Sequence, residues 1–210
     1  MENGSGKPGS AAQKPQFELI GGHPALDFVN TLDWRFREGR QEELITSYDD
    51  VVRFTVQSGL MTSAEGRRLL RPALANKAAQ VVADTRALRE AAARSFYAGV
   101  SGDEPPGATI RELEEFFREA ESHRKLRWMK SQLQWDFPEG LLAPELPLWI
   151  LSLETAQLVT SEDMEMVREC GNPECRWLFL DSSKNHTRRW CDMKICGNRM
   201  KARRFKAQHG

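Results

Sequence analysis

No stretch of this 210-residue sequence approaches the run of about 18 apolar residues that a membrane-spanning helix needs. Its first residues, MENGSGKPGSAAQKP, lack the apolar central segment of a secretory signal. Their Gly, Ser, Pro and Ala predict a flexible leader over residues 1–16. We therefore expect a cytoplasmic protein without a membrane partner, in a compartment where thiols stay reduced.

The sequence also lacks the common short motifs of catalytic sites. It contains no G-x-S-x-G nucleophile elbow, no G-x-x-x-x-G-K-[ST] phosphate loop and no H-E-x-x-H zinc-protease motif. Its histidines are scattered, at His23, His123, His186 and His209. A site assembled from distant residues would leave no such motif, but the pattern favours a protein that is not an enzyme.

Net charge is absent too, because 30 Lys and Arg balance 30 Asp and Glu. This balance conceals an asymmetry along the chain. Residues 1–167 carry 19 basic and 26 acidic side chains, a net charge of −7, whereas residues 168–210 carry 11 and 4, a net charge of +7. Such asymmetry favours a polyanionic partner for the C-terminal part, with docking onto the protein's own acidic body as the alternative.

Helical periodicity dominates the body of the chain. From Leu74 to Ala92, apolar side chains recur every three or four residues, which predicts the longest helix. The segment 125–138 instead alternates polar and apolar residues, which predicts a β-hairpin containing Trp128 and Trp135. We expect Trp34 and Trp149, like these two, to pack in the core or the hairpin. Further helices are expected at 23–39, 47–61, from Thr62, at 110–120 and at 146–162.

The four cysteines form two pairs with the same spacing, Cys170-x4-Cys175 and Cys191-x4-Cys196. Two such pairs can place four thiolates on one tetrahedral zinc ion, and a four-thiolate site leaves no position open for water or substrate. We therefore expect one structural Zn²⁺ per chain. Disulfides, a redox pair and an iron–sulfur cluster are the alternatives. His186 is a competing ligand, although it suits an exposed turn better.

The residues between the cysteine pairs, RWLFLDSSKNHTRRW, predict a strand, a polar turn and a second strand. We expect Trp177 and Trp190 to form a small core there. The fold class is then mainly α. An α-rich domain over residues 17–162 contains a small β-hairpin, and a treble-clef-like four-cysteine zinc finger of knuckle, hairpin and helix follows over residues 163–210.

The C-terminal segment resembles the CGNR zinc finger, which ends a family of bacterial proteins described as stress-induced transcription regulators. The opening GGHPALDFVNTLDWR is similar to the start of the α-rich ABATE domain that precedes this finger. The resemblance implies a DNA-binding finger fused to a domain that senses a signal. The matching finger residues are Cys170, Asn172, Cys175, Trp177, Phe179, Asp181, Asn185, Arg188, Arg189, Trp190, Cys191, Met193, Cys196, Gly197, Asn198 and Arg199.

A helix beginning near Asp192 would carry most cations of the C-terminal part, with Arg199, Arg203 and Lys206 on one side. Cations on DNA phosphates release counterions, so affinity falls with salt, and Arg in a groove adds contacts to guanine. A solvated basic face or an acidic protein partner is the alternative. The expected nucleic-acid-binding residues are Arg188, Arg189, Lys194, Arg199, Lys201, Arg203, Arg204 and Lys206.

The first helix would present Asp27, Asn30, Thr31 and Trp34 away from its apolar stripe. This polar and aromatic face could line a pocket for a small ligand or a protein partner, with a solvated face as the alternative. The sequence thus predicts a transcription regulator that binds DNA through a zinc finger. The competing hypothesis is a zinc-stapled protein-interaction module without DNA binding. A homodimer is compatible with either.

Overall fold

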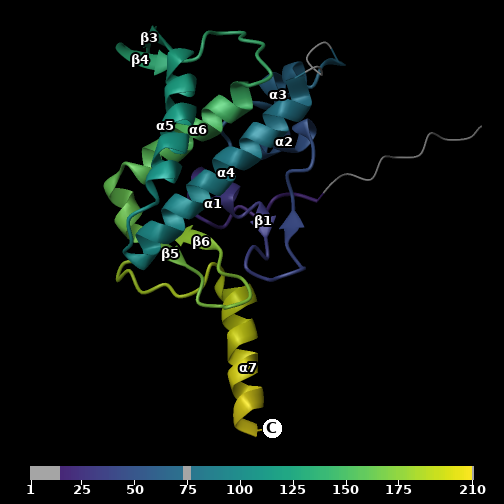
Figure 1. The fold of residues 1–210 in the computed structure, drawn as a ribbon, viewed down its shortest axis with the longest axis vertical. Coiled ribbons are helices and arrows are strands. Elements are labelled where there is room, and N and C mark those ends of the chain that lie inside the picture. The colour runs from purple at the N-terminus through teal and green to yellow at the C-terminus, as the bar shows by residue number, and fades with distance from the viewer. Residues whose placement is uncertain (1–14, 73–76, 210) are drawn as a thin grey trace, which may run out of the picture.

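The structure, a computed structural model, describes residues 15–72 and 77–209 (Figure 1). Most of the predicted leader at 1–16, and Leu74 of the longest predicted helix, lie outside the described residues. As expected, the fold is mainly helical, with small antiparallel strand pairs and a four-cysteine cluster near the C-terminus. No helix in the described ranges is both long and apolar enough to cross a membrane.

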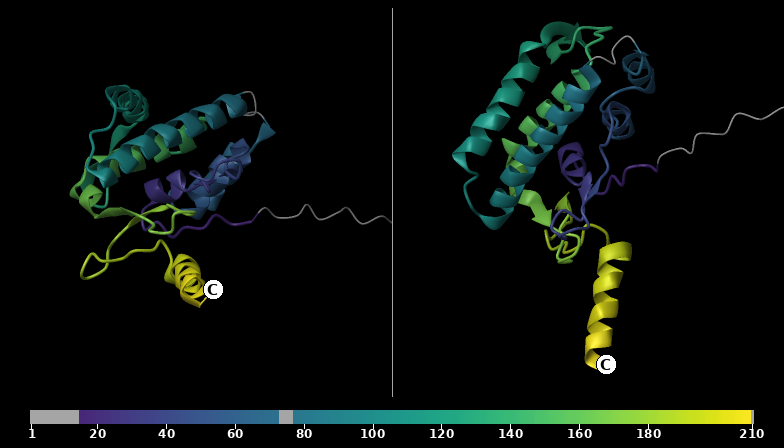
Figure 2. Two further views of the ribbon diagram at one scale, coloured as in Figure 1. Left: turned by 60° about the horizontal axis from the view of Figure 1, so that its bottom comes forward. Right: turned by 45° about the vertical axis from the view of Figure 1, so that its right-hand side comes forward.

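Three long helices lie against one another, and three shorter ones cover the same core (Figures 1 and 2). We call residues 15–162 the helical body and residues 163–209 the finger segment. The long helices are α4 (Ala78–Ser101), α5 (Gly107–Ser122) and α6 (Leu146–Val159), and the short ones are α1 (Pro24–Val29), α2 (Tyr48–Gln57) and α3 (Ser63–Leu69).

In the described ranges, strands occur as three antiparallel pairs. The pairs are β1 (Leu32–Asp33) with β2 (Glu42–Glu43), β3 (Lys125–Met129) with β4 (Gln132–Asp136), and β5 (Val167–Glu169) with β6 (Leu178–Leu180). The finger segment also contains a π-helical turn, η3 (Met193–Gly197), and the terminal helix α7 (Asn198–His209), and the 3₁₀ helix η2 (Glu162–Met166) leads into it.

The helix starts follow the local sequence closely. The helix expected from Thr62 is α3, where Thr62 and Glu65 form a capping box in which each side chain accepts a hydrogen bond from the other's backbone N–H. Ser47 and Asp50 form a second capping box at α2. The long helix, the hairpin and the helices at 110–120 and 146–162 are confirmed as α4, β3–β4, α5 and α6.

The first helix is much shorter than predicted. The periodicity indicated a helix to Gly39, but α1 ends at Val29. The next side chains form tertiary and local hydrogen bonds instead: Asn30 bonds the backbone of Leu178, and the Thr31 hydroxyl donates to the carbonyl of Phe28. Residues 32–33 then pair as β1, so the apolar spacing beyond residue 30 does not describe a helix face.

One face of the β3–β4 hairpin is apolar and open to solvent. Register partners Leu126 and Trp135 are 53% and 55% exposed, and partners Trp128 and Leu133 are 73% and 62% exposed. Trp128 and Trp135 thus lie in the hairpin, one of the two expected places, and not in the core. Trp149 is buried, and its ring stacks on His123 with centroids 3.7 Å apart.

The strand of the finger segment has a different partner from the one predicted. We expected a hairpin within residues 176–190, but β6 pairs with β5, which precedes the first cysteine. The chain after β6 forms no strand because side chains satisfy its backbone. Asp181 is fully buried, and its carboxylate accepts hydrogen bonds from the N–H groups of Ser183 and Arg188 at 3.0 and 2.9 Å.

The finger segment shares a core with the helical body. Val167 of β5 and Leu178 of β6 belong to one buried cluster with Leu26 of α1, Phe96 of α4 and Leu158 of α6. Asn30 fixes the position of β6 against α1 by two hydrogen bonds. Its side-chain amide donates to the carbonyl of Leu178 at 2.9 Å and accepts from the N–H of the same residue at 3.0 Å. Both groups of Asn30 are buried, so the two parts form one packed unit.

Replacing Asn30 by Ala should lower the free energy of unfolding by about 3 kcal/mol, because a buried carbonyl and a buried N–H of Leu178 lose their partners. Chemical denaturation of the zinc-loaded protein measures this. The control is Asn185→Ala on the exposed turn, which should change stability by less than about 0.5 kcal/mol. Equal effects of the two substitutions would show that the contact contributes nothing.

Candidate metal centre and basic helix

The four cysteines converge on one point. Their sulfur atoms all lie within 4.8 Å of one another, as predicted. The Sγ atoms of Cys175 and Cys191 are 3.6 Å apart, and those of Cys191 and Cys196 are 3.7 Å apart. Four thiolates bound tetrahedrally to zinc at about 2.3 Å would be about 3.8 Å apart, so the arrangement fits one zinc ion.

The same distances argue against the alternatives. A disulfide needs sulfurs about 2.05 Å apart, and all four cysteines are free. An iron–sulfur cluster needs room for several metal and sulfide atoms between the cysteine sulfurs, which this spacing lacks. His186 is exposed, with its ring nitrogen 2.9 Å from the carbonyl oxygen of Asp181, and is not part of the described sulfur cluster.

The first cysteine pair lies at the tip of the β5–β6 hairpin. The amide of Cys170 donates to the carbonyl of Trp177, and the amides of Cys175 and Arg176 donate to the carbonyl of Asn172. Arg176 closes this knuckle with a left-handed backbone, at φ +56°. The buried Asn172 amide also donates to the sulfur of Cys196 at 3.5 Å, and so links the two cysteine pairs. Outer-shell bonds of this kind orient metal ligands.

The second pair leads directly into the basic helix. Asp192 caps the π-helical turn η3 by accepting a hydrogen bond from the amide of Ile195 at 2.8 Å, and its carbonyl accepts from the amide of Cys196. Cys196 and Gly197 are buried, and α7 begins at Asn198. A metal ion bound by Cys196 therefore fixes the position from which α7 leaves the molecule.

The thiols of this cluster influence one another's ionisation. Hydrogen bonding to the Cys170 sulfur, together with burial, raises the pKa values of Cys175 and Cys191. Hydrogen bonds from these two thiols lower the pKa of Cys170. A cluster without metal thus holds protons at neutral pH, which zinc must displace to bind four thiolates.

The predicted tryptophan core of the finger segment is present. Trp177 is buried with Phe179 and three of the cysteines, and Trp190 packs against this cluster. The indole N–H of Trp177 donates to Asp33 of β1 at 2.8 Å. This bond ties the cluster to the N-terminal part of the chain.

The predicted nucleic-acid-binding residues fall into two groups. Lys194 and all of α7 from Lys201 to His209 are exposed, and α7 projects away from the rest of the molecule (Figures 1 and 2). Among the described residues, no ion pair involves Lys194, Lys201, Arg204 or Lys206. These side chains are available to a partner.

The other group contacts the protein itself. Arg188 donates to the carbonyls of Trp190 and Cys191, so its guanidinium holds the finger segment together. The exposed Arg189 lies over Trp190 at 5.2 Å. On α7, Arg203 forms an ion pair with Glu174, and Arg199 lies 5.9 Å from the ring centre of Trp34. One side of α7 therefore faces the body, a division that the helical spacing alone does not reveal.

The predicted ligand-binding residues lie at the junction between α1 and the finger segment. Asp27, Asn30 and Thr31 are buried rather than facing away from the apolar stripe. They line a cavity of about 180 Å³, and Trp34 lines a neighbouring cavity of about 150 Å³. Glu18, Asp33 and Trp177 line both cavities, and none of these three was expected to do so.

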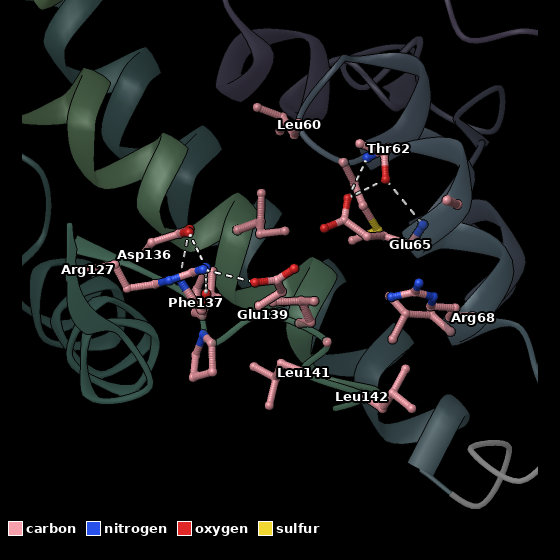
Figure 3. A pocket seen from close by; sticks show the side chains of 17 residues that line it. Leu60, Thr62, Glu65, Arg68, Arg127, Asp136, Phe137, Glu139, Leu141 and Leu142 are labelled. Carbon is pink, nitrogen blue, oxygen red and sulfur yellow. Dashed lines mark hydrogen bonds and ion pairs between the residues drawn. The ribbon is translucent and has the colours of Figure 1, made fainter. Parts of the chain in front are cut away.

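A third cavity, of about 410 Å³, lies between α3 and the β3–β4 hairpin, at the opposite end of the molecule from α7 (Figures 1 and 3). Figure 3 shows Arg127 directed toward Asp136 and Glu139, with which it forms ion pairs at 3.1 and 3.2 Å. The charges of these three side chains, on the hairpin side of the cavity, are therefore paired with one another.

Family models match both parts of the chain. The CGNR zinc finger matches residues 166–209, and the ABATE model, described as "Putative stress-induced transcription regulator", matches residues 22–162. The chain belongs to the ABATE family. No curated protein matches it. The finger match and the sulfur geometry together assign the ABATE chain one structural zinc ion, held by Cys170, Cys175, Cys191 and Cys196.

Zinc content and thiol reactivity test this site. The purified chain should contain one zinc ion, and a chelator should release it and expose four titratable thiols. Because binding displaces protons from Cys175 and Cys191, zinc affinity should fall as pH falls from 8 to about 6. Elemental analysis after dialysis at each pH measures this. An affinity independent of pH would contradict the predicted proton release.

The stability of the folded protein should depend on pH through the carboxyl group of Asp27. Burial raises its pKa to about 6, although hydrogen bonds from the amides of Gly21 and Ile20 oppose the shift. The folded state then binds this proton more tightly than the unfolded state, so stability falls as pH rises from about 4 through 6. Asp27→Asn keeps an acceptor for Gly21 and should gain about 2–3 kcal/mol relative to the unmodified protein between pH 4 and pH 7.

Thermal unfolding across this pH range measures the difference. Asp103→Asn, which changes an exposed loop carboxylate, is the matched control and should track the unmodified protein at every pH. If the stability of Asp27→Asn instead changes with pH in the same way as that of the unmodified protein, Asp27 is ionised in the folded protein down to its ordinary pKa.

Proposed function

We propose that this chain regulates transcription by binding duplex DNA through α7, which its zinc centre holds in place. One observation carries the proposal: a basic helix begins two residues after a metal-ligating cysteine and projects from the body with every side chain from Lys201 to His209 exposed. Membership of the ABATE family, with its transcription-regulator description, supports the same function.

The dimensions and charge of α7 suit a DNA groove. Its 12 residues span about 18 Å at 1.5 Å per residue, and the major groove of B-DNA admits an α-helix. The helix contains five Lys and Arg and no acidic residue. Each cation that contacts a phosphate displaces counterions, which makes the binding depend on salt.

The two sides of α7 have different roles in this proposal. Arg199 and Arg203 contact Trp34 and Glu174, so they orient the helix against the body. Lys201 and Arg204 have no ion-pair partner among the described residues. Counted from Asn198 at 100° per residue, they lie at 300° and 240° around the helix. They are on the side away from the body contacts, and we assign the DNA contacts to them. Lys206 lies on the same side as Arg199 and Arg203, nearer the tip of the helix.

The test is a salt titration with a randomised duplex pool. Lys201→Ala with Arg204→Ala should reduce the slope of log K against log salt by about 2, because two phosphate contacts are lost. Fluorescence anisotropy at several salt concentrations measures the slope. Zinc content should be unchanged, since both side chains are exposed.

The matched control is Arg67→Ala with Arg111→Ala. These exposed cations lie on α3 and α5, so the control removes the same charge from the helical body. It should leave the slope within about 0.5 of the unmodified value. Equal slopes for the two double variants, or absence of duplex binding at low salt, would overturn the proposal and favour a protein-interaction module.

A further inference from the structure

We infer that the cavity between the finger segment and the N-terminal strand binds a small organic cation, which competes with the guanidinium of Arg199 for the ring of Trp34. We call this space of about 150 Å³ the junction cavity. It is formed by β1, the zinc-binding segment and the start of α7, so it joins parts of the chain that lie far apart in sequence.

The walls of the junction cavity are aromatic. Trp34 and Trp177 both line it, with Ile20 and Ile195 beside them. Trp34 is fixed in an unusual left-handed backbone conformation at φ +50°, where its amide donates to the carboxylate of Asp33 at 2.7 Å. Conformations of this kind are costly for a bulky residue and persist where the surrounding structure determines them. The Asp33 carboxylate also accepts from the indole of Trp177, and so positions both rings.

The charge in and around the cavity is negative. The acidic residues Glu18, Asp33 and Asp192 are among those that line it. Three of the zinc-ligating cysteines line it too, and four thiolates around one Zn²⁺ carry a net charge of −2. Arg199 is the single cationic side chain among its lining residues. Indole rings with surrounding negative charge are the chemistry that recognises ammonium groups.

The protein's own cations already occupy positions near this aromatic wall. The guanidinium carbon of Arg199 lies 5.9 Å from the ring centre of Trp34, within the range of a cation–π contact. Arg37, which does not line the cavity, lies 5.1 Å from the same ring. Because Arg199 is exposed and its distance is near the limit of this interaction, a ligand cation can displace it at small cost.

The cavity has room to extend beyond this contact. The adjoining cavity of about 180 Å³ shares Glu18, Asp33 and Trp177 with it and is also lined by the buried Asp27. Glu18 is exposed, and no ion pair or hydrogen bond of its carboxylate occurs among the described residues. Its charge is therefore available to a ligand that reaches from one cavity into the other.

The first experiment is calorimetric titration of the zinc-loaded full chain with choline, at an ionic strength held constant with sodium chloride. Choline should bind in a 1:1 complex. Its neutral isostere 3,3-dimethyl-1-butanol, which has the same shape without the charge, should bind at least tenfold more weakly. Equal binding of the two compounds, or no choline binding, overturns the inference.

Two substitutions should change choline affinity in opposite directions. Glu18→Gln should weaken binding about threefold by removing an attractive charge, with Glu38→Gln on the exposed loop as the matched control. Arg199→Ala should tighten binding two- to fivefold by removing the competitor. Weaker binding in Arg199→Ala, or equal effects of the two glutamate substitutions, overturns the competition. A loss of stability cannot produce the expected gain.

Coupling to DNA rests on the proposed function and has its own readout. A cation bound at Trp34 releases Arg199 for a phosphate contact, so saturating choline should steepen the salt slope of DNA binding by about 1. The Arg199→Ala variant should show no such change. Choline binding is measured without DNA, so a failure of the ligand site can be distinguished from a failure of DNA binding. If choline binds but the salt slope of DNA binding does not change, the coupling is overturned.

Discussion

A three-residue strand of the finger segment, β6, completes the core of the helical body, and most of the architecture depends on this contact. Leu178 packs among side chains of α1, α4 and α6, while its backbone forms two hydrogen bonds with Asn30. The same hairpin carries the first cysteine pair at its tip. A small metal site cannot bury much apolar surface alone. Here the metal site and the body each supply part of the other's interior.

This arrangement joins α7 to the body through short contacts and not through a long linker. Cys196 is buried in the π-helical turn from which α7 continues, and Asn172 bonds its sulfur from the opposite knuckle. Arg203 and Glu174 add a contact on the body side. The knuckle and the base of the helix are thus joined by short connections.

Much of this architecture could be predicted from the sequence. Local rules were sufficient for the helix that starts at Thr62, for the hairpin around Trp128 and for the helices of the core. The cysteine spacing predicted the metal site because ligation imposes its own geometry. The family resemblance gave the order of the two parts, and the family models confirmed it.

The errors occurred where distant segments decide the structure. The helix at α1 stops at Asn30 because its amide is used by a strand 148 residues away, and no local pattern indicates that. β6 pairs with β5 rather than with the chain after its turn, since Asp181 satisfies that chain with its side chain. For the same reason spacing alone could not show that Arg188 and Arg203 contact the protein itself, or that Asp33 positions two tryptophans.

The contact between Asn30 and Leu178 also has a consequence for the timing of folding during synthesis. At about 5–20 residues per second, a ribosome needs roughly 7–30 seconds to make the 148 residues that separate these partners. Throughout that interval α1 lacks the strand that covers it and satisfies Asn30. The core that α1 shares with β6 can close only after the cysteine-bearing segment has emerged, so α1 reaches its native contacts long after it has been translated.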